Sequence, residues 1–188
     1  MSLQVAKSRI EKARVKEQEE LDLSRLGLTE VPAEVFQLTQ LEGLDLSENK
    51  IKSLPPELGN LVNLNALDLS ENQLTAIPSE IGNLVQLERL DLSENKLASL
   101  PPEIGKLTLL PMLDLSINQL TEIPAEIVMM SSLKLLDLSS NKLTTLPSQM
   151  SLINFRDIDI RNNPLPPELL ELASDNLTVF RRYLAAMG

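Results

Sequence analysis

An eleven-residue pattern of leucines recurs at a fixed interval along most of the chain. It reads Leu41-x-x-Leu44-x-Leu46-x-x-Asn49-x-Ile51, and its period is 23 residues. Further copies begin at Leu64, Leu87, Leu110, Leu133 and, one residue early, Phe155, and a degenerate first copy begins at Gln18. A unit this short cannot enclose a core of its own, so the seven copies are expected to stack and bury their leucines against one another.

Each unit predicts one short strand and one returning segment. Leu44 and Leu46 are two residues apart and therefore point to one side of a strand, while Asp45 points to the other. The remaining residues must bring the chain back to its starting side, which makes successive strands parallel. Leu54 and Leu58 have helix-like spacing and are expected to close the core from the returning side.

The pattern over residues 18–165 resembles the leucine-rich repeat family. The second half of a unit, Leu54-Pro55-Pro56-Glu57-Leu58-Gly59-Asn60-Leu61, is similar to the intracellular subclass with L-P-x-E-I-G-x-L. This resemblance implies an α/β fold, a right-handed solenoid with a parallel concave β-sheet and short helical or 3-10 turns on the convex side. Within the subclass, Asn163–Leu170 and the later Tyr183-Leu184 resemble the end of the repeats in bacterial Roco proteins, where a GTPase domain follows.

A solenoid exposes its core at both ends, so both ends need covers. We expect an N-terminal capping helix over residues 1–17, seven repeats over 18–165 and a C-terminal helical cap over 166–188. The apolar stripe of the first helix would consist of Leu3, Ala6, Ile10 and Ala13. In the last segment, Asp175 is the expected N-cap of a helix that carries Leu177, Phe180 and Leu184.

Three columns of residues in the repeat have structural explanations. Asn49 and its equivalents follow each strand and are expected to bond buried backbone groups of adjacent turns. Pro55 and its equivalents would keep the outer segment from forming a second sheet. Gly59, Gly82 and Gly105 fit the end of the outer helical turn, where glycine is a common cap.

Composition excludes most enzyme classes. The chain has no cysteine and no histidine, so the usual thiolate nucleophile, general base and metal ligands are missing. We expect no enzymatic activity, no cofactor and no metal site. With one Tyr and no Trp, the chain also lacks the aromatic platforms that a carbohydrate or other small-molecule substrate would need.

Charge narrows the range of partners. The net charge of -10 repels nucleic acid and anionic lipid, so neither is the expected partner. The first twenty residues interleave apolar with charged residues and form no signal peptide. We therefore expect a cytoplasmic protein.

An aspartate occupies the outward position of every predicted strand. These residues are Asp22, Asp45, Asp68, Asp91, Asp114, Asp137 and Asp159. Strands lie about 4.8 Å apart, so the aspartates form an acidic ladder, and the serines two residues later can hydrogen-bond it. The ladder either steers a basic partner or is only the pattern of the repeat.

The repeat departs from its pattern in the fourth and fifth complete units. Two residues before each aspartate the chain carries Glu20, Gly43, Ala66, Arg89, Met112, Leu135 and Asp157. Met112 and Leu135 fall on adjacent strands, and Ile117 replaces the glutamates of earlier units. We expect an apolar patch there beside Asp91, Asp114 and Asp137, rimmed by Arg89, Lys134 and Arg156. Apolar clusters with a charged rim are where binding energy concentrates.

The sequence therefore predicts a non-catalytic protein–protein interaction module that binds a protein on its concave face. The Roco resemblance implies the recognition or regulatory domain of a larger GTPase, with a small GTPase or an adjoining GTPase domain as partner. No G-x-x-x-x-G-K-[ST] motif is present, so GTP binding is not carried over. The alternative is the recognition arm of an effector or ubiquitin-ligase enzyme whose catalytic part lies outside this chain.

Overall fold

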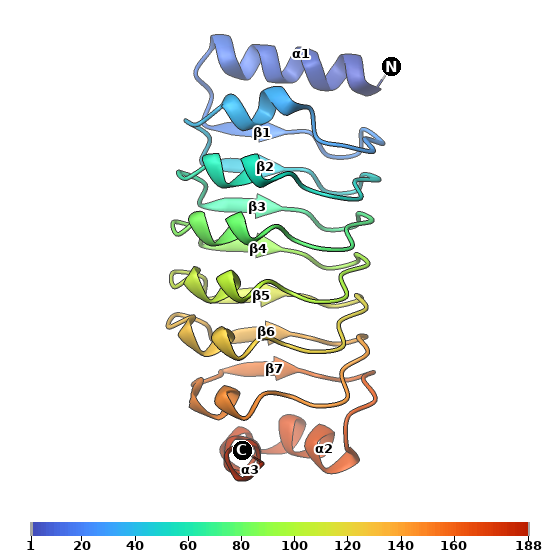
Figure 1. The fold of residues 1–188 in the computed structure, drawn as a ribbon, viewed down its shortest axis with the longest axis vertical. Coiled ribbons are helices and arrows are strands. Elements are labelled where there is room, and N and C mark those ends of the chain that lie inside the picture. The colour runs from blue at the N-terminus through green and yellow to red at the C-terminus, as the bar shows by residue number, and fades with distance from the viewer. Residues whose placement is uncertain (1, 188) are drawn as a thin grey trace.

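The computed structural model describes residues 2–187 and shows a single coil of stacked repeats (Figure 1). The ends carry α1 (Ser2–Val15), α2 (Pro167–Asp175) and α3 (Leu177–Ala186). The strands are β1 (Glu20–Asp22), β2 (Gly43–Asp45), β3 (Ala66–Asp68), β4 (Arg89–Asp91), β5 (Met112–Asp114), β6 (Leu135–Asp137) and β7 (Asp157–Asp159). The returning segments contain 3-10 turns: η1 (Ala33–Gln37), η2 (Pro56–Asn60), η3 (Ser79–Asn83), η4 (Pro102–Lys106), η5 (Ala125–Met129) and η6 (Ser148–Leu152).

The seven strands form one parallel sheet in chain order, as the repeat predicts. Equivalent positions pair across it, so Leu44 lies opposite Leu67 and Asp45 opposite Asp68. Because this register holds from repeat to repeat, each column of the sequence becomes a row across the sheet. We call the solvent-facing side of the sheet the concave face and the side of the 3-10 turns the convex face.

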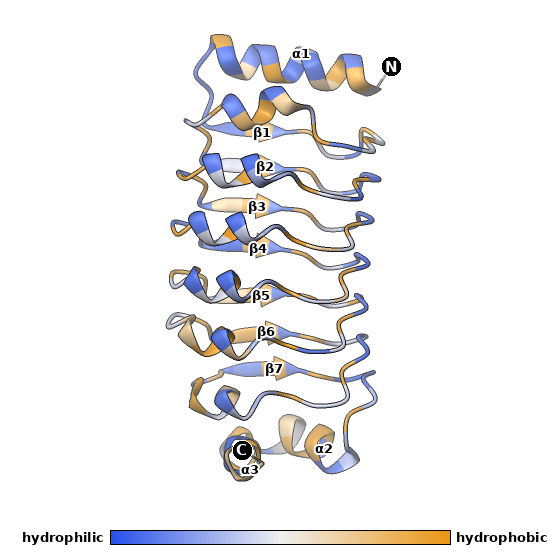
Figure 2. Cartoon of the chain, viewed as in Figure 1, coloured by the Kyte–Doolittle hydropathy of each residue, from blue (hydrophilic) through white to orange (hydrophobic). Residues whose placement is uncertain are grey.

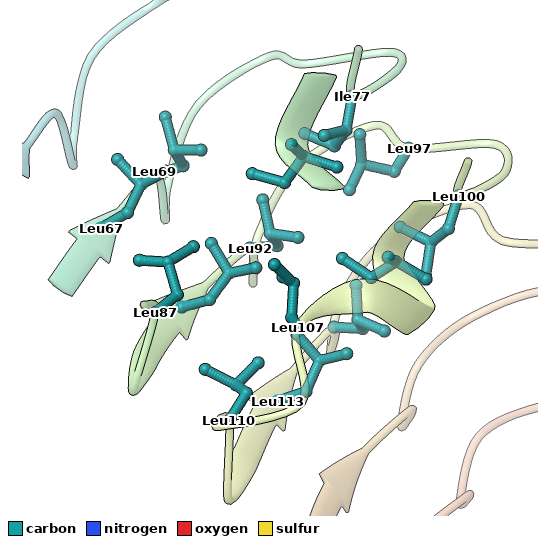
Figure 3. Packing of buried hydrophobic residues seen from close by; sticks show 14 of the residues in the cluster. Leu67, Leu69, Ile77, Leu87, Leu92, Leu97, Leu100, Leu107, Leu110 and Leu113 are labelled. Atoms are coloured by element: carbon teal, nitrogen blue, oxygen red, sulfur yellow. The ribbon is translucent and has the colours of Figure 1, made fainter. Parts of the chain in front are cut away.

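The core lies between the sheet and the convex turns. In the third and fourth repeats, Leu69 and Leu92 follow their strands and meet Ile77, Leu97 and their neighbours from the returning segments (Figure 3). All of these side chains are buried. One leucine-sized residue per position suffices because every layer repeats the geometry of the one before.

The asparagine column satisfies backbone groups of two repeats at once. Asn72 Oδ1 accepts from the Ile51 N–H, and its amide donates to the carbonyls of Leu46, 2.9 Å away, and Leu69. The same arrangement recurs along the column. The first repeat has Leu26 in place of an asparagine, and Asn49 of the second repeat bonds its Leu26 N–H and Leu23 carbonyl. This confirms the structural interpretation of these residues.

The prolines begin the convex turns. Pro78 has extended backbone dihedral angles, and its carbonyl accepts the i+3 bond from Ile81 that starts the 3-10 turn. The fixed φ of proline suits this place, and its missing N–H leaves no donor unsatisfied. The outer segments form 3-10 turns and no second sheet in the described residues, in agreement with the prediction.

The prediction that the convex glycines serve as helix caps is wrong. None of Gly59, Gly82 and Gly105 has a positive φ, so they are not left-handed caps. A Cβ on Gly105 would lie 2.3 Å from the backbone oxygen of Glu126, and one on Gly82 would lie 2.9 Å from that of Glu103. These glycines are needed because successive convex turns approach each other closely.

The end helices cover the first and last layers. Ala6, Ile10 and Ala13 of α1 are buried, but Leu3, in the first turn of α1, is 51% exposed and does not belong to the stripe. Phe180 and Leu184 of α3 are buried, whereas Leu177 is only partly so. The helix is capped by Asn176, which accepts bonds from Thr178 and Val179, rather than by Asp175, the last residue of α2.

The outermost residues of the predicted caps, Met1 and Gly188, lie outside the described part of the chain. Within residues 2–187, no helix has the length and apolarity to cross a bilayer.

Candidate binding site on the concave face

The acidic ladder runs across the whole concave face, one aspartate at the end of each strand. Asp45 Oδ1 accepts from both the N–H and the Oγ of Ser47, at 2.9 Å and 2.6 Å. The two following repeats have the same pair of bonds, and in Asp114 and Asp137 the backbone N–H bond is kept. In these five central aspartates, one carboxylate oxygen is thus bonded to the backbone, and the other remains available to a ligand.

Arginines neutralise the ladder at its two ends. Arg9 lies 3.4 Å from Asp22, and Arg161 forms an ion pair with Asp159. The Ser24 hydroxyl, with help from its N–H and Arg9, lowers the pKa of Asp22, and the Arg161 side chain lowers the pKa of Asp159. Among the described residues, the five aspartates between them make no salt bridge. The uncompensated charge is therefore in the middle of the face.

A groove of about 520 Å³ follows the ladder from β1 to β5. Its lining includes Gly43 and Ala66, which have the smallest side chains at the start of any strand. Seven carboxylates and one cation, Arg89, line the groove, and Met112 stands at its β5 end.

Met112 and Leu135 form an apolar pair next to the groove. They lie directly opposite each other at the start of β5 and β6, and Met112 is 47% exposed. In Figure 2 the start of β6 has hydrophobic colours, whereas that of β7 is hydrophilic. Burial of this pair by a partner would remove apolar surface from water. The repeat pattern itself does not require apolar residues at these two positions.

Ile117 is not part of that pair. It comes after the end of β5, beyond Asp114 and Ser116, so the acidic ladder separates it from Met112. It is 51% exposed and has φ of 53°, a left-handed conformation that β-branched residues disfavour. Of the three residues predicted for the patch, Met112 and Leu135 are therefore adjacent, whereas Ile117 is a separate exposed apolar residue on the other side of the acidic ladder.

The predicted basic rim is exposed. Arg89 starts β4 and lines the groove, Lys134 precedes Leu135, and Arg156 precedes β7. In the described part of the chain, none of the three forms a salt bridge, so their charges are available to a partner. Asp91, Asp114 and Asp137 lie beside Met112 and Leu135 through the sheet register.

Two features of this surface bear on metal binding and on acid catalysis. The carboxylates lie on an open face, and across residues 2–187 no group of three or more acidic side chains is arranged to hold a metal ion. General acid catalysis would need a carboxyl group kept protonated by burial, whereas the pKa values of Asp22 and Asp159 are lowered by their hydrogen-bond donors.

Sequence reasoning missed the groove. Glu20 and Glu88 line it, and neither was among the expected binding residues. The small residues Gly43 and Ala66 interrupt a row of larger residues in the sequence. They indicate a groove only when the positions of the side chains on both sides of it are known.

Comparison with known proteins agrees with this architecture. Family models described as leucine-rich repeat region, leucine rich repeat and Leucine Rich Repeat match residues 56–140, 19–74 and 132–152. The chain is a leucine-rich repeat protein. The search of curated proteins found no match.

Among solved structures, a leucine-rich repeat protein of Leptospira interrogans is 40% identical, with a TM-score of 0.78 over 82% of this chain. The ectodomain of the receptor kinase GASSHO1/SCHENGEN3 of Arabidopsis thaliana, in complex with CASPARIAN STRIP INTEGRITY FACTOR 2, is 36% identical with a TM-score of 0.71 over 81%. A TDR receptor is 29% identical, also with 0.71, over 78%. The chain spans only 40%, 19% and 26% of the lengths of these three.

Proposed function

We propose that this protein is a non-catalytic module that binds another protein on its concave face, with Met112 and Leu135 at the energetic centre. The observation that carries the proposal is the partly exposed apolar pair at the end of a charged groove, in a fold whose class generally serves protein interaction. The similar Arabidopsis ectodomain is in complex with CASPARIAN STRIP INTEGRITY FACTOR 2, and this complex supports a protein partner here.

The two kinds of surface contribute differently to binding. Each buried apolar side chain can supply on the order of 1.5 kcal/mol or more, whereas a screened surface ion pair supplies about 1 kcal/mol or less. The acidic ladder acts over a longer range and accelerates association. Affinity is thus expected to depend on the pair, and the association rate on the ladder.

The test recovers the partner by pull-down and measures both rates at low and high salt. Met112→Ala and Leu135→Ala are expected to raise the dissociation rate, and Asp45→Asn and Asp68→Asn to lower the association rate mainly at low salt. Asparagine retains the oxygen that accepts the serine bonds, so these variants change charge alone. If the Asn variants abolish binding and the Ala variants leave dissociation unchanged, the apolar pair is not the centre.

We further propose a cytoplasmic location and a Roco-type context, in which the partner is a small GTPase or an adjoining GTPase domain. The similarity of Asn163–Leu170 to the end of Roco repeats supports this context, and the absence of cysteine is compatible with a reducing compartment. Binding of a GTPase domain loaded with GDP or GTP, measured by calorimetry against Met112→Ala, tests it. If the GTPase domain binds in neither the GDP-loaded nor the GTP-loaded state, the proposal of a GTPase partner is wrong, and the proposal of a protein-binding module stands.

A further inference from the structure

The groove on the concave face contains a hollow that is bordered by carboxylates. The hollow lies over Ala66, the small side chain with which β3 begins and which lines the groove. Asp45 and Asp68 border it two residues further along the strands. Because each uses one oxygen to accept the serine bonds, the other oxygens of these two carboxylates remain to face a ligand.

A third carboxylate, that of Glu20, borders the hollow on the β1 side. A Cβ built on Gly43 would lie 1.8 Å from Oε2 of Glu20, so the Glu20 side chain extends from β1 over the glycine of β2. Among the described residues Glu20 has no hydrogen-bond or ion-pair partner there. The Glu20 carboxylate therefore occupies the space over Gly43 and lies beside Ala66, which pairs with Gly43 across the sheet.

Building on the proposed function, we infer that the concave face binds an extended segment of its partner that carries a lysine or arginine over Ala66 and a large apolar residue over Met112 and Leu135. Charge complementarity selects the cation, since the groove has seven carboxylates against Arg89 alone. The apolar stem of a lysine or arginine can lie against the small side chain of Ala66 while its charged end reaches the neighbouring carboxylates.

The sheet register sets the spacing between the two anchor residues. Ala66 on β3 is two strands from Met112 and three from Leu135, which corresponds to about 10 to 14 Å at the usual strand separation. An extended chain advances about 3.3 Å per residue. The cation and the apolar residue are therefore separated by about three or four positions in the bound segment.

Arg89 determines what lies between the anchors. It occupies the start of β4, between Ala66 and Met112 in the same row, and makes no salt bridge within the described chain. A second cation at the middle of the segment would meet this guanidinium, whereas an acidic residue would pair with it. Cation, then acid or neutral, then apolar is the expected order of side chains along the groove.

The experiment uses fluorescent synthetic peptides with both ends blocked, built on neutral glycine and serine. Each carries one lysine and one leucine at a separation of one to six positions, in both chain directions, and binding is measured by fluorescence anisotropy at low and high salt. The tightest binding is expected at a separation of three or four. Replacing the lysine by norleucine should weaken it about fivefold at low salt, and leucine by serine about tenfold.

Variants of the protein locate the two anchors. Asp45→Asn with Asp68→Asn should reproduce the loss seen with the norleucine peptide. Ala66→Met should also remove the preference for lysine, because it fills the hollow with a side chain that β5 already carries at this position. Glu57→Gln with Glu122→Gln, on exposed residues outside the groove, removes the same amount of charge and should leave binding unchanged.

Three outcomes would overturn the inference. Binding that does not depend on the separation, or that survives Ala66→Met with its lysine preference, would show that the hollow is not used. A dimer that dissociates in the Asp45→Asn, Asp68→Asn variant would place the basic α1 of a second copy in the groove. If a natural partner needs Met112 but ignores both aspartates, the proposed function stands and the inference about the cation is wrong.

Discussion

Asn72 and Ile51 belong to successive repeats, yet the side-chain oxygen of Asn72 accepts the backbone N–H of Ile51 at 3.0 Å. Both residues are buried, so no water replaces this bond. The buried backbone N–H groups of one repeat are thus hydrogen-bonded only when the next repeat is folded against it. This dependence makes folding of the stack cooperative.

The first prediction follows from this column. Asn95 accepts from the Leu74 N–H and donates to the carbonyls of Leu69 and Leu92, so Asn95→Ala leaves buried backbone groups of two repeats unpaired. We expect a loss of about 1 to 3 kcal/mol in the free energy of unfolding, measured by urea denaturation. Asn65→Ala, which removes only an exposed bond to Glu42, is the control and should cost less than about 0.5 kcal/mol. An unchanged midpoint for Asn95→Ala would contradict the role of the column.

The second prediction concerns the convex glycines. Gly105→Ala places a Cβ against the rigid backbone oxygen of Glu126, whereas the closest atoms to a Cβ on Gly59 are side-chain atoms of Asn83 and Glu80 at 2.8 Å. Gly105→Ala should destabilise the protein by about 1 to 3 kcal/mol and Gly59→Ala by less. Thermal unfolding of the two variants gives the order, and a reversed order would mean that the convex turns can move apart freely.

The third prediction exploits the conformation of Ile117. Asparagine tolerates the left-handed region far better than isoleucine, and Ile117 gains little from burial. Ile117→Asn is therefore expected to raise the free energy of unfolding by about 0.5 to 1 kcal/mol. The reverse change, Asn162→Ile, is a matched control at the equivalent turn and should lower it. Weaker binding of the natural partner by the more stable Ile117→Asn variant would show that Ile117 is retained for recognition.

The fourth prediction is a dependence of stability on pH. Asp159 has a pKa below its ordinary value of 3.8 because of Arg161, so between the folded and unfolded pKa values the unfolded chain binds more protons. The stabilisation is present above about pH 4 and is lost as the pH falls through the folded pKa. Urea unfolding at a series of pH values should show a smaller acid loss for Asp159→Asn than for the wild-type protein. An identical slope would mean that the ion pair with Arg161 does not persist in solution.

The sequence predicted the layers of this fold because every layer repeats the same signals. Leu44 and Leu46 define the buried side of a strand, and Asn49 marks the turn after it, so one repeat contains the information for all. The prediction failed at contacts between repeats. Gly105 has no special backbone conformation, and its close neighbour Glu126 is in the next repeat, so local turn chemistry could not reveal its purpose.

The candidate site could be predicted only in part. The pairing of Met112 with Leu135 followed from the period, because a constant spacing places equivalent residues side by side. The separation of Ile117 from them did not, since three residues beyond a strand end lead to a different place on the face. Likewise, the reach of Glu20 over Gly43 depends on a side-chain direction that no pattern of residue types specifies.

The glycines behind the sheet also affect its front. Gly59, Gly82 and Gly105 allow neighbouring convex turns to approach, whereas the equivalent positions in the flanking repeats are Phe36 and Val128. In a stacked coil, the bend depends on how far apart the layers are held at the back relative to the fixed spacing of the strands. The curvature of the concave face is therefore expected to depend on one column of residues on the convex face, so substitutions there can reshape the groove while each of its lining residues stays unchanged.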